Sequence, residues 1–226
     1  MKVHFFSGNK AISDAAFDGC TGLRGDVEWR RFSLTDQAAR DAYNAEAPEA
    51  DIIISFLNPF VFRDEHLART KQAYNIHPST PQHPGQDPQH WTIYDGTFVS
   101  GATLHRMTRK VDAGAILDVV EKKLPDDSLP ADIDRQSENM ALALLFRRLD
   151  DILAGNLEPI DRQWSADRYR KRADFIKICQ IPADIDAAEL EYRIRCFHAP
   201  SYKNRLQTVI CGRRFVYAGD AEPEDE

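Results

Sequence analysis

The stretch Asp51-Ile52-Ile53-Ile54-Ser55-Phe56 decides the fold of this chain. Its apolar residues run without interruption over the length of one strand, which is typical of a central parallel strand covered on both faces. Helices are expected on either side of it, at residues 36–46 and 64–70, and the next strand at 72–76. Strands that alternate with helices indicate βαβ units, so the sequence predicts an α/β fold with an open, mainly parallel sheet.

The same pattern extends toward both ends of the chain. The first helix is expected to stop at a turn formed by Gly19, Gly22 and Gly25, and the longest helix carries a broad apolar face. Residues 77–90 are rich in Pro and His and are expected to form a loop. The other expected elements are strands at 2–7, 26–32, 98–107 and 115–124 and helices at 10–18 and 132–154.

The sequence changes character after the long helix. A further helix is expected at 186–195, followed by two strands at 206–211 and 213–217 that turn at Cys211-Gly212. We therefore predict a larger domain over residues 1–160 and a small C-terminal segment, a helix and a β-hairpin, over residues 161–226.

Composition excludes several classes of protein. The 226 residues are 42% hydrophobic and 29% charged, with a net charge of -7. No apolar run approaches the roughly 20 residues of a membrane-spanning helix, and an acidic chain without a long basic run is poorly suited to a nucleic-acid backbone. The four cysteines are scattered without a CxxC pair, which fits a reducing cytoplasm. We expect a cytoplasmic protein that binds neither membrane nor nucleic acid.

Three polar side chains supply candidate chemistry. Asn75 and His77 end the strand at 72–76, and Asp112 lies in the turn between the two strands of the predicted hairpin. Ligands of such sheets bind beyond the carboxyl ends of the strands. An amide, an imidazole and a carboxylate together can stabilise an oxyanion and transfer a proton at a carbonyl carbon. Each residue alone has a plain alternative as a turn or loop residue; their combination favours a catalytic site.

Two further clusters leave alternatives open. The histidines His77, His83, His90 and His105 raise the possibility of a metal site, but their spacing matches no standard ligand pattern, and we expect no metal. The basic run from Arg168 to Arg172 is either a solvated charged face or a site for a phosphorylated ligand.

Taken together, these segments resemble the catalytic domain of the folate-dependent formyltransferases. The motifs that carry the resemblance are Asn75-Ile76-His77-Pro78-Ser79, a loop ending at Gly85, Gly101-Ala102-Thr103-Leu104-His105 and Asp112-Ala113-Gly114. The loop before Gly85 is shorter than in the family and lacks its arginine, which leaves the acceptor in question more than the chemistry.

The resemblance implies a Rossmann-like formyltransferase fold and 10-formyltetrahydrofolate as the donor, with no metal. It implies that Asn75 donates to the formyl oxygen, that His77 assists and takes a proton, and that Asp112 tunes His77. It places the donor at Phe56, Leu57, Asn58, Phe60, Arg109, Val111 and Gly114.

Three branches of the family differ in the amine that they formylate. Methionyl-tRNA formyltransferases carry an additional C-terminal domain, for which this chain leaves little length. Glycinamide ribonucleotide formyltransferases use a Gly-rich phosphate loop, which Ser7-Gly8-Asn9-Lys10 reproduces only in part. The C-terminal segment is most similar to that of the sugar N-formyltransferases, which act on nucleotide-linked amino-dideoxy sugars and would place the protein in lipopolysaccharide O-antigen biosynthesis.

On this interpretation the acceptor is a nucleotide-linked amino sugar whose base, sugar and amine position stay open. Basic residues would meet its diphosphate, and an aromatic ring, Trp91 or Tyr202, would stack on its base. The candidate acceptor contacts are Ser79, Gly85, Trp91, Arg170, Arg172, Tyr202 and Lys203. A non-catalytic folate- or nucleotide-binding module of the same fold is the alternative from another class, and the resemblance implies a homodimer formed through the hairpin.

Overall fold

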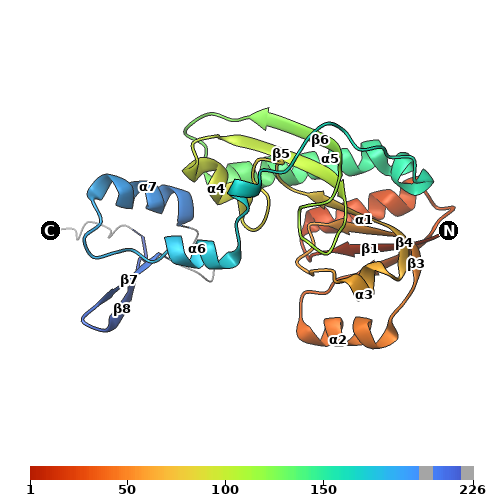
Figure 1. Cartoon of the computed structure of the whole chain (residues 1–226), viewed down its shortest axis with the longest axis horizontal. Helices are drawn as coiled ribbons and strands as arrows, with labels where there is room; N and C mark the ends of the chain where they lie inside the picture. Colours follow the sequence, from red (N-terminus) through yellow and green to blue (C-terminus); the bar gives the residue numbers. More distant parts are fainter. Residues whose placement is uncertain (199–205, 220–226) are drawn as a thin grey trace.

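The computed structural model describes residues 1–198 and 206–219. In these residues a six-stranded sheet of order β2-β1-β3-β4-β5-β6 forms the centre of the molecule, with helices on both of its faces (Figure 1). A separate two-stranded hairpin lies at the C-terminal end. The predicted α/β fold with a mainly parallel sheet is confirmed. No helix of this described part combines the length and apolar character needed to cross a bilayer.

The sheet is parallel over four strands and antiparallel over the last two. β1, β2, β3 and β4 pair in parallel, whereas β5 runs antiparallel to β4 and β6 antiparallel to β5. The β5–β6 hairpin predicted from the sequence is therefore present, and it returns the chain to the carboxyl end of β4. The strands are β1 (Lys2–Ser7), β2 (Glu28–Phe32), β3 (Ala50–Phe56), β4 (Thr70–His77), β5 (Val99–Arg106) and β6 (Ile116–Lys123).

The central strand β3 shows why its sequence is apolar throughout. Ile52 and Ile54 pack into the core beneath α1 (Ala11–Leu23) and α5 (Pro130–Ala154). Ile53 points to the opposite face, into an aromatic core that includes Tyr43 of α2 (Gln37–Glu46). Alternate residues of a strand face opposite sides of the sheet, so a strand covered on both sides needs apolar residues at every position. The short helix α3 (Asp64–Leu67) lies on the same side as α2.

Helix α1 is longer than the glycines suggested. It continues through Gly19 and Gly22 to Leu23, so of the three glycines expected in a turn only Gly25 lies in one. A Cβ atom on Gly19 would lie 2.4 Å from Cζ of Phe146, so the missing side chain lets α1 pack closely against α5. The glycine serves helix packing here, and the helix tolerates it because tertiary contacts outweigh its low propensity.

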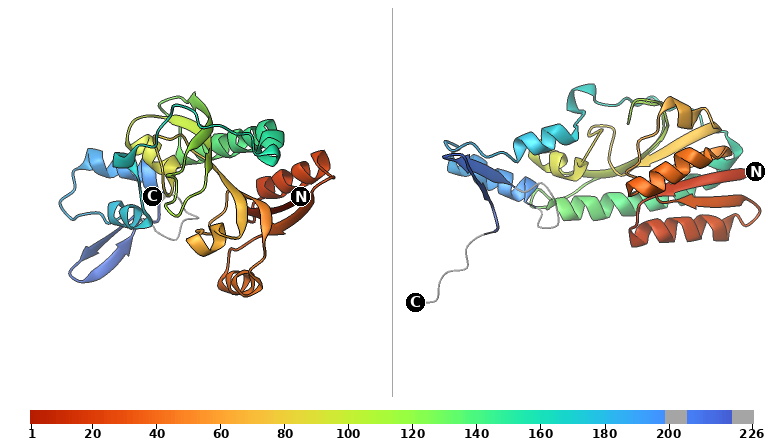
Figure 2. Two further views of the ribbon diagram at one scale, coloured as in Figure 1. Left: turned by 45° about the vertical axis from the view of Figure 1, so that its right-hand side comes forward. Right: turned by 90° about the horizontal axis from the view of Figure 1, so that it is seen from below.

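The residues after α5 join the rest of the molecule through a shared core. Trp91 and Ile93 of α4 (Pro88–Tyr94) pack with Phe175 of α6 (Arg172–Ile178) and Phe197 of α7 (Ala187–Phe197). Helix α7 and the hairpin of β7 (Gln207–Ile210) and β8 (Arg213–Val216) confirm the predicted elements. Helix α4 interrupts the segment expected to be a loop, and α6 was not predicted. Figure 2 shows this C-terminal part at one end of an elongated molecule; the boundary proposed between residues 160 and 161 stays a prediction.

Candidate active site

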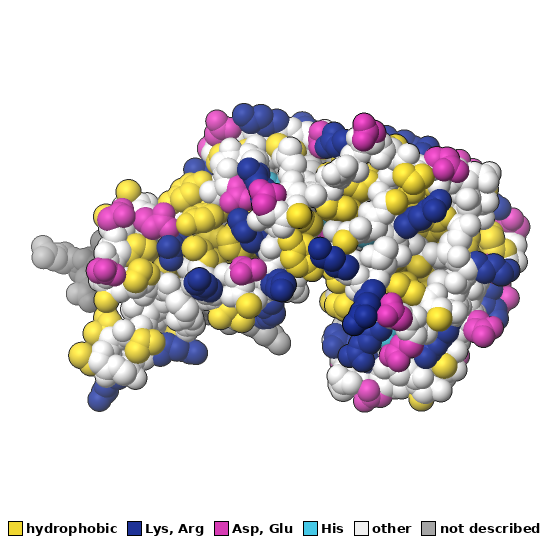
Figure 3. All heavy atoms as spheres, in the orientation of Figure 1, with side chains coloured by type: hydrophobic (Ala, Val, Ile, Leu, Met, Phe, Trp, Pro, Cys, Tyr) yellow, Lys and Arg dark blue, Asp and Glu magenta, His cyan; other side chains and the backbone are white. Residues whose placement is uncertain are grey.

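A cavity of about 740 Å³ opens beyond the carboxyl ends of the parallel strands. Its volume falls in the range typical of small-molecule sites, roughly 300–1,000 Å³. Figure 3 shows Lys and Arg side chains on both sides of the hollow between the sheet and the C-terminal part. The lining comes mainly from residues 8–10, 57–62, 75–78, 85–89, 107–108, 110–112 and 169–172, so distant parts of the chain share one site.

The structure brings Asn75, His77 and Asp112 together at this cavity. Asn75 and His77 are two residues apart at the end of β4 and therefore point to the same face of the sheet. Nδ1 of His77 lies 3.5 Å from Oδ2 of Asp112. Asp112 is almost fully buried and has a φ of 45°, and the backbone N–H of Gly85 donates to its Oδ2 at 3.0 Å. The turn therefore places the Asp112 carboxylate beside the His77 imidazole.

His105 completes this arrangement, although it was expected only as the last residue of a motif. Its Nδ1–H donates to the carbonyl of Arg106 at 2.9 Å, which leaves Nε2 to accept from the Asn75 amide at 3.0 Å. The same Nε2 lies 3.4 Å from Oδ1 of Asp112. Asn75 and His105 are direct partners in the antiparallel β4–β5 register. His105 was missed because no pattern in the sequence placed β5 beside β4 in this register.

The Asp112 carboxyl is held in its ionised form. Burial raises its pKa, but attraction to the His77 ring when that ring is protonated and the hydrogen bond from the Gly85 N–H outweigh burial and leave the pKa below its usual value. An ionised carboxylate beside an imidazole can stabilise that ring after it takes a proton. The pair is therefore suited to proton transfer near neutral pH.

Trp164 packs against the catalytic groups, and nothing in the sequence spacing pointed to it. Its indole N–H donates to the Gly114 carbonyl at 2.8 Å, which fixes the turn that carries Asp112. Its ring meets His77 and His105 edge to face, with centroids 5.8 and 5.0 Å away. The residues just before the basic cluster therefore support the catalytic groups.

Of the seven predicted donor contacts, four line the cavity and three do not. Leu57, Asn58, Phe60 and Val111 form part of its wall. Phe56 is fully buried in the core beneath α1 and α5, because strand alternation turns Ser55 toward the cavity and Phe56 away from it.

Arg109 and Gly114 also lie outside the lining. The Arg109 side chain is 81% exposed beside Asp64, at a shallow neighbouring depression. Gly114 faces backbone, since a Cβ atom there would lie 1.8 Å from the Arg106 carbonyl oxygen. These two residues and Phe56 therefore lie outside the cavity lining, and their assignment to the donor is not carried further.

Only some of the predicted acceptor contacts line the cavity. Gly85, Arg170 and Arg172 line the cavity. Ser79 is buried and its carbonyl accepts from the Thr103 hydroxyl, so it supports the loop. Trp91 cannot stack on a base as expected, because its ring is 4% exposed in the C-terminal core, with the Arg170 guanidinium 4.8 Å from its centroid. Tyr202 and Lys203 lie outside the described residues.

Cationic side chains surround the cavity. Lys10 pairs with Asp134 at 3.4 Å and with Glu138, both on α5. Lys171 and Arg172 line the opposite side and form no ion pair with any described residue. Across residues 1–198 and 206–219, no group of three or more His, Cys, Asp or Glu side chains is placed to hold a metal.

Comparison with known proteins adds to this geometry. Residues 7–146 match the formyl transferase family. Among solved structures, a sugar N-formyltransferase from a Shewanella species superposes with a TM-score of 0.78 at 18% identity, and each chain covers 98% of the other. A 4-N formyltransferase from Francisella tularensis gives 0.77 at 22% identity and the same coverage of 98% for each chain.

A third structure was solved with ligands bound. The N-formyltransferase from Helicobacter canadensis, in complex with folinic acid and dTDP-3-aminofucose, gives a TM-score of 0.67 at 18% identity, covering 93% of this chain and 84% of that one. At these identities the likeness shows the shared fold. The family match spans more than half of the sequence and includes Asn75, His77 and Asp112, and the chain therefore belongs to the formyl transferase family of enzymes.

Proposed function

We propose that this protein transfers the formyl group of 10-formyltetrahydrofolate to the amine of a nucleotide-linked amino-dideoxy sugar. The observation that carries the proposal is the meeting of Asn75, His77 and Asp112 at one end of a cavity whose other walls are apolar on one side and cationic on another. Family membership supports the transfer of a formyl group. The acceptor rests on the cavity and on likeness to sugar N-formyltransferases along the whole chain.

Asn75 stabilises the charge that develops during transfer. Its amide points into the cavity from the end of β4, and its contact with His105 orients the N–H groups. As the amine bonds to the formyl carbon, negative charge grows on the formyl oxygen, and Asn75 donates to that oxygen. One such preorganised donor is worth about 3–4 kcal/mol of barrier.

His77 and Asp112 handle the proton that the attacking amine releases. The imidazole takes the proton, and the ionised Asp112 at 3.5 Å stabilises the resulting cation. Both side chains are buried and the Trp164 ring packs edge to face against His77, so the charge pair acts in a medium of low dielectric. The tetrahedral carbon then collapses, the bond from the formyl carbon to N10 of the folate breaks, and N10 takes the proton from His77, so that tetrahydrofolate leaves as a neutral amine.

The wall at residues 57–62 fits the donor. Leu57 adopts a φ of 47°, which turns the chain so that backbone groups and the ring of Phe60 line the cavity. A flat bicyclic pterin has both apolar faces and a hydrogen-bonding edge, and such a wall offers contacts for both. The bound folinic acid in the Helicobacter canadensis relative supports this choice of donor.

The cations at residues 171 and 172 fit a diphosphate. Lys171 and Arg172 have no ion-pair partner in the described chain, so they are available to a ligand. Arg170 is already engaged by Asp95 and by the Trp91 ring. We therefore assign phosphate binding to Lys171 and Arg172 rather than to Arg170. With such an acceptor, we further propose a cytoplasmic enzyme that modifies sugars for lipopolysaccharide O-antigen.

Glycinamide ribonucleotide and methionyl-tRNA remain the alternative acceptors. The N-terminal segment argues against a phosphate loop of the ribonucleotide type, because the Lys10 ammonium is drawn to two carboxylates of α5. A non-catalytic binding module is the other alternative, and the complete set of Asn75, His77 and Asp112 argues against it.

We also propose that the C-terminal hairpin joins two copies of the chain. Val209, Ile210 and Phe215 are each at least 49% exposed on a hairpin that pairs with no other strand of the described chain. Exposed apolar side chains gathered on one element are typical of an interface.

A mass-spectrometric acceptor screen tests the function. The protein and 10-formyltetrahydrofolate are incubated with nucleotide-linked 3-amino and 4-amino sugars, glycinamide ribonucleotide and charged initiator tRNA. A gain of one formyl group on an amino sugar, absent with the His77→Ala variant, is the expected result. A gain on the ribonucleotide or the tRNA would replace the proposed acceptor, and folate binding without any product would favour the binding module.

A further inference from the structure

The loop between β4 and α4 contacts both members of the catalytic pair through its backbone. The carbonyl oxygen of His83 accepts a hydrogen bond from Nε2 of His77 at 3.2 Å. Two residues later, the N–H of Gly85 donates to Oδ2 of Asp112 at 3.0 Å. The position of this loop therefore sets the orientation of the imidazole and the carboxylate at the same time.

The first of these bonds also requires a hydrogen on Nε2 of His77. A carbonyl oxygen can only accept, so the hydrogen must be on Nε2 of His77, and Nδ1 is left facing Asp112. The nitrogen that exchanges a proton with the amine is then Nδ1. A loop that moved away would free the ring to adopt the other tautomer or another orientation.

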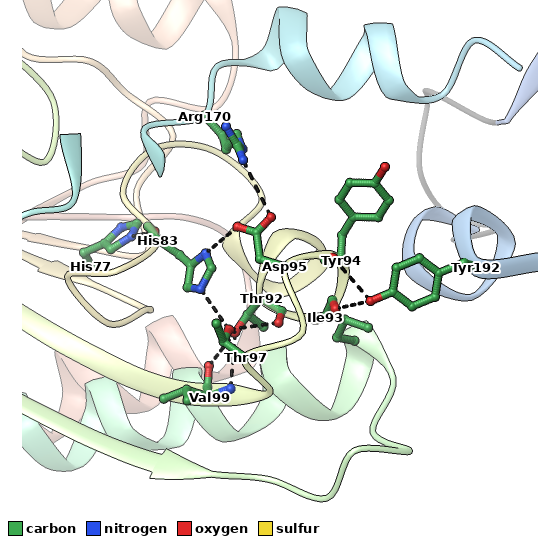
Figure 4. Close-up of polar contacts among 10 residues, drawn as sticks. All are labelled: His77, His83, Thr92, Ile93, Tyr94, Asp95, Thr97, Val99, Arg170 and Tyr192. Atoms are coloured by element: carbon green, nitrogen blue, oxygen red, sulfur yellow. Dashed lines mark hydrogen bonds and ion pairs between the residues drawn. The ribbon is translucent and has the colours of Figure 1, made fainter. Parts of the chain in front are cut away.

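The His83 side chain anchors this loop in the interior (Figure 4). The ring is 1% exposed, with Nε2 2.9 Å from Oγ1 of Thr97 and Nδ1 3.6 Å from Oδ2 of Asp95. On the other side of Asp95, Oδ1 lies 3.6 Å from the guanidinium of Arg170. We call these four residues, His83, Asp95, Thr97 and Arg170, the loop anchor.

Within the loop anchor, the buried Nδ1 of His83 and Oδ2 of Asp95 form a donor and acceptor pair. Nδ1 of His83 and Oδ2 of Asp95 have no closer polar partner among the described residues, and both are fully buried. Burial first, and then the charges of Arg168, Arg170 and His77, lower the pKa of His83 to about 4, so the ring is neutral at neutral pH. With its single proton on Nδ1 the ring faces Asp95 as a donor and accepts from the Thr97 hydroxyl at Nε2.

The anchor also ties the loop to the C-terminal part of the chain. The N–H of Arg170 donates to the Pro84 carbonyl at 3.1 Å, and the N–H of Gln86 donates to the Arg170 carbonyl at 2.9 Å. Gly85 lies so close to this segment that a Cβ atom would be 2.1 Å from the Arg170 carbonyl oxygen. The backbone contacts with Arg170 and the side-chain contacts of His83 thus both hold the loop against its surroundings.

We infer that His83, held by Asp95 and Thr97, is a positioning residue that fixes the Nε2–H tautomer and the orientation of His77 through its own carbonyl oxygen. This inference rests on the proposed role of His77 as the proton acceptor. His83 contacts neither the amine nor the formyl group; it acts through the loop backbone. It also gives a reason for a histidine in the shortened loop that the catalytic mechanism alone does not use.

Steady-state kinetics of His83→Ala provide the first test. We expect kcat to fall by about 10- to 100-fold, since small displacements of a catalytic group have effects of this size, while KM for both substrates changes by less than about twofold. The acid limb of the kcat–pH profile should shift, because His77 loses its fixed tautomer. Asp95→Asn, which still offers an oxygen to Nδ1–H, should retain most of the activity, and Asp95→Leu should not.

His90→Gln is the matched control. His90 is also buried, on the neighbouring helix α4, but its Nδ1 donates to the Cys196 carbonyl in the C-terminal core and not to the loop. We expect this variant to lose thermal stability while keeping the kcat–pH profile of the wild type. If the kcat–pH profile shifted equally in His90→Gln and His83→Ala, the effect of His83 would be one of general packing, and the inference would be overturned.

Histidine ¹⁵N NMR of the unliganded protein separates this inference from the proposed function. The wild type should show His77, identified by its loss in His77→Ala, as an Nε2–H tautomer, and His83→Ala should show a mixture. If His83→Ala does not fold, Thr97→Val removes only one hydroxyl and carries the same measurement. An unchanged His77 signature in these variants would refute the anchor, whereas a changed signature without sugar formylation would retain the anchor and refute only the acceptor.

Discussion

The Asn75 amide is the group on which the proposed chemistry depends most, and its side chain makes few contacts that the fold needs. It is half-buried, and within the described chain its side chain bonds only His105. We expect Asn75→Ala to lower kcat by about 10²–10³-fold, the usual loss for one oxyanion donor, with little change in the melting temperature. Asn44→Ala, which removes a partner of His66 outside the cavity lining, is the control and should keep full kcat. A kcat within twofold of wild type in Asn75→Ala would contradict the mechanism.

His4 is a residue whose effect is on stability alone. It is 1% exposed in β1, and burial, followed by the charges of Arg30 and Lys2, lowers its pKa from 6.5 to about 4. The unfolded chain therefore binds more protons between about pH 6.5 and 4, so this residue reduces stability progressively as the pH falls through that window. Above about pH 6.5 both states carry the neutral ring and the effect vanishes.

We expect His4→Leu to make the free energy of unfolding less dependent on pH in that interval. Nδ1 of His4 has no hydrogen-bond partner among the described residues, so its removal sacrifices no bond on that side of the ring. Urea unfolding at pH 7 and pH 5 measures the effect. The difference between wild type and variant should change between the two pH values, in favour of the variant at pH 5; equal differences at both would show that the ring does not titrate as proposed.

At the scale of elements, substitution by alanine is expected to change stability in opposite directions at two glycines. Gly101 lies in β5, where a Cβ atom would be 2.5 Å from the backbone oxygen of Val120 in β6. Gly101→Ala should therefore destabilise the protein by about 1–3 kcal/mol through overpacking. Gly22, in helix α1, has open space where a Cβ atom would lie, with no atom within 4 Å, so Gly22→Ala should stabilise it by about 0.5–1 kcal/mol. Chemical unfolding of both variants checks the pair; the same sign for both would contradict the packing described for β5 and β6.

The elements that could be predicted from the sequence are those whose burial is visible in a regular pattern. β3 is apolar at nearly every position because both of its faces are covered, and α5 has an apolar face long enough to be recognised. Helices α4 and α6 have seven residues each, too few for an apolar repeat of helical period to be recognised. They are held by the shared core around Phe175 and Phe197, a tertiary effect that no local pattern reveals.

Only part of the candidate site could be predicted from the sequence. Asn75, His77 and Asp112 could be found because their types and spacing carry chemistry. The errors at Phe56 and Trp91 arose because residue type alone does not tell which face of an element a ring occupies. Trp164 and the backbone bonds of Gly85 were missed because they depend on contacts between residues far apart in the chain.

Over the whole molecule, the C-terminal part belongs to the active site as much as the sheet does. Trp164 contacts His77 and the Asp112 turn, and residues 169–172 form one wall of the cavity. Tyr192 of α7 donates to the carbonyl of Ile93 at 2.7 Å, which ties α7 to the helix just before Asp95. Removal of this part would therefore disturb the catalytic residues and not merely an accessory surface.

The last prediction concerns the assembly of two chains through the β7–β8 hairpin. Thr208 pairs with Phe215 and Ile210 with Arg213, so Ile210 and Phe215 lie on one face of the hairpin. A two-stranded hairpin is only marginally stable by itself, and a second copy that covered this face would remove both apolar side chains from water. We expect a dimer at micromolar concentration in size-exclusion chromatography with light scattering, and a monomer for the double variant Ile210→Lys/Phe215→Lys. Leu23→Lys, at an exposed leucine on α1, is the matched control and should remain dimeric; a monomeric wild type, or a dimer that survives the double substitution, would exclude this face as the interface.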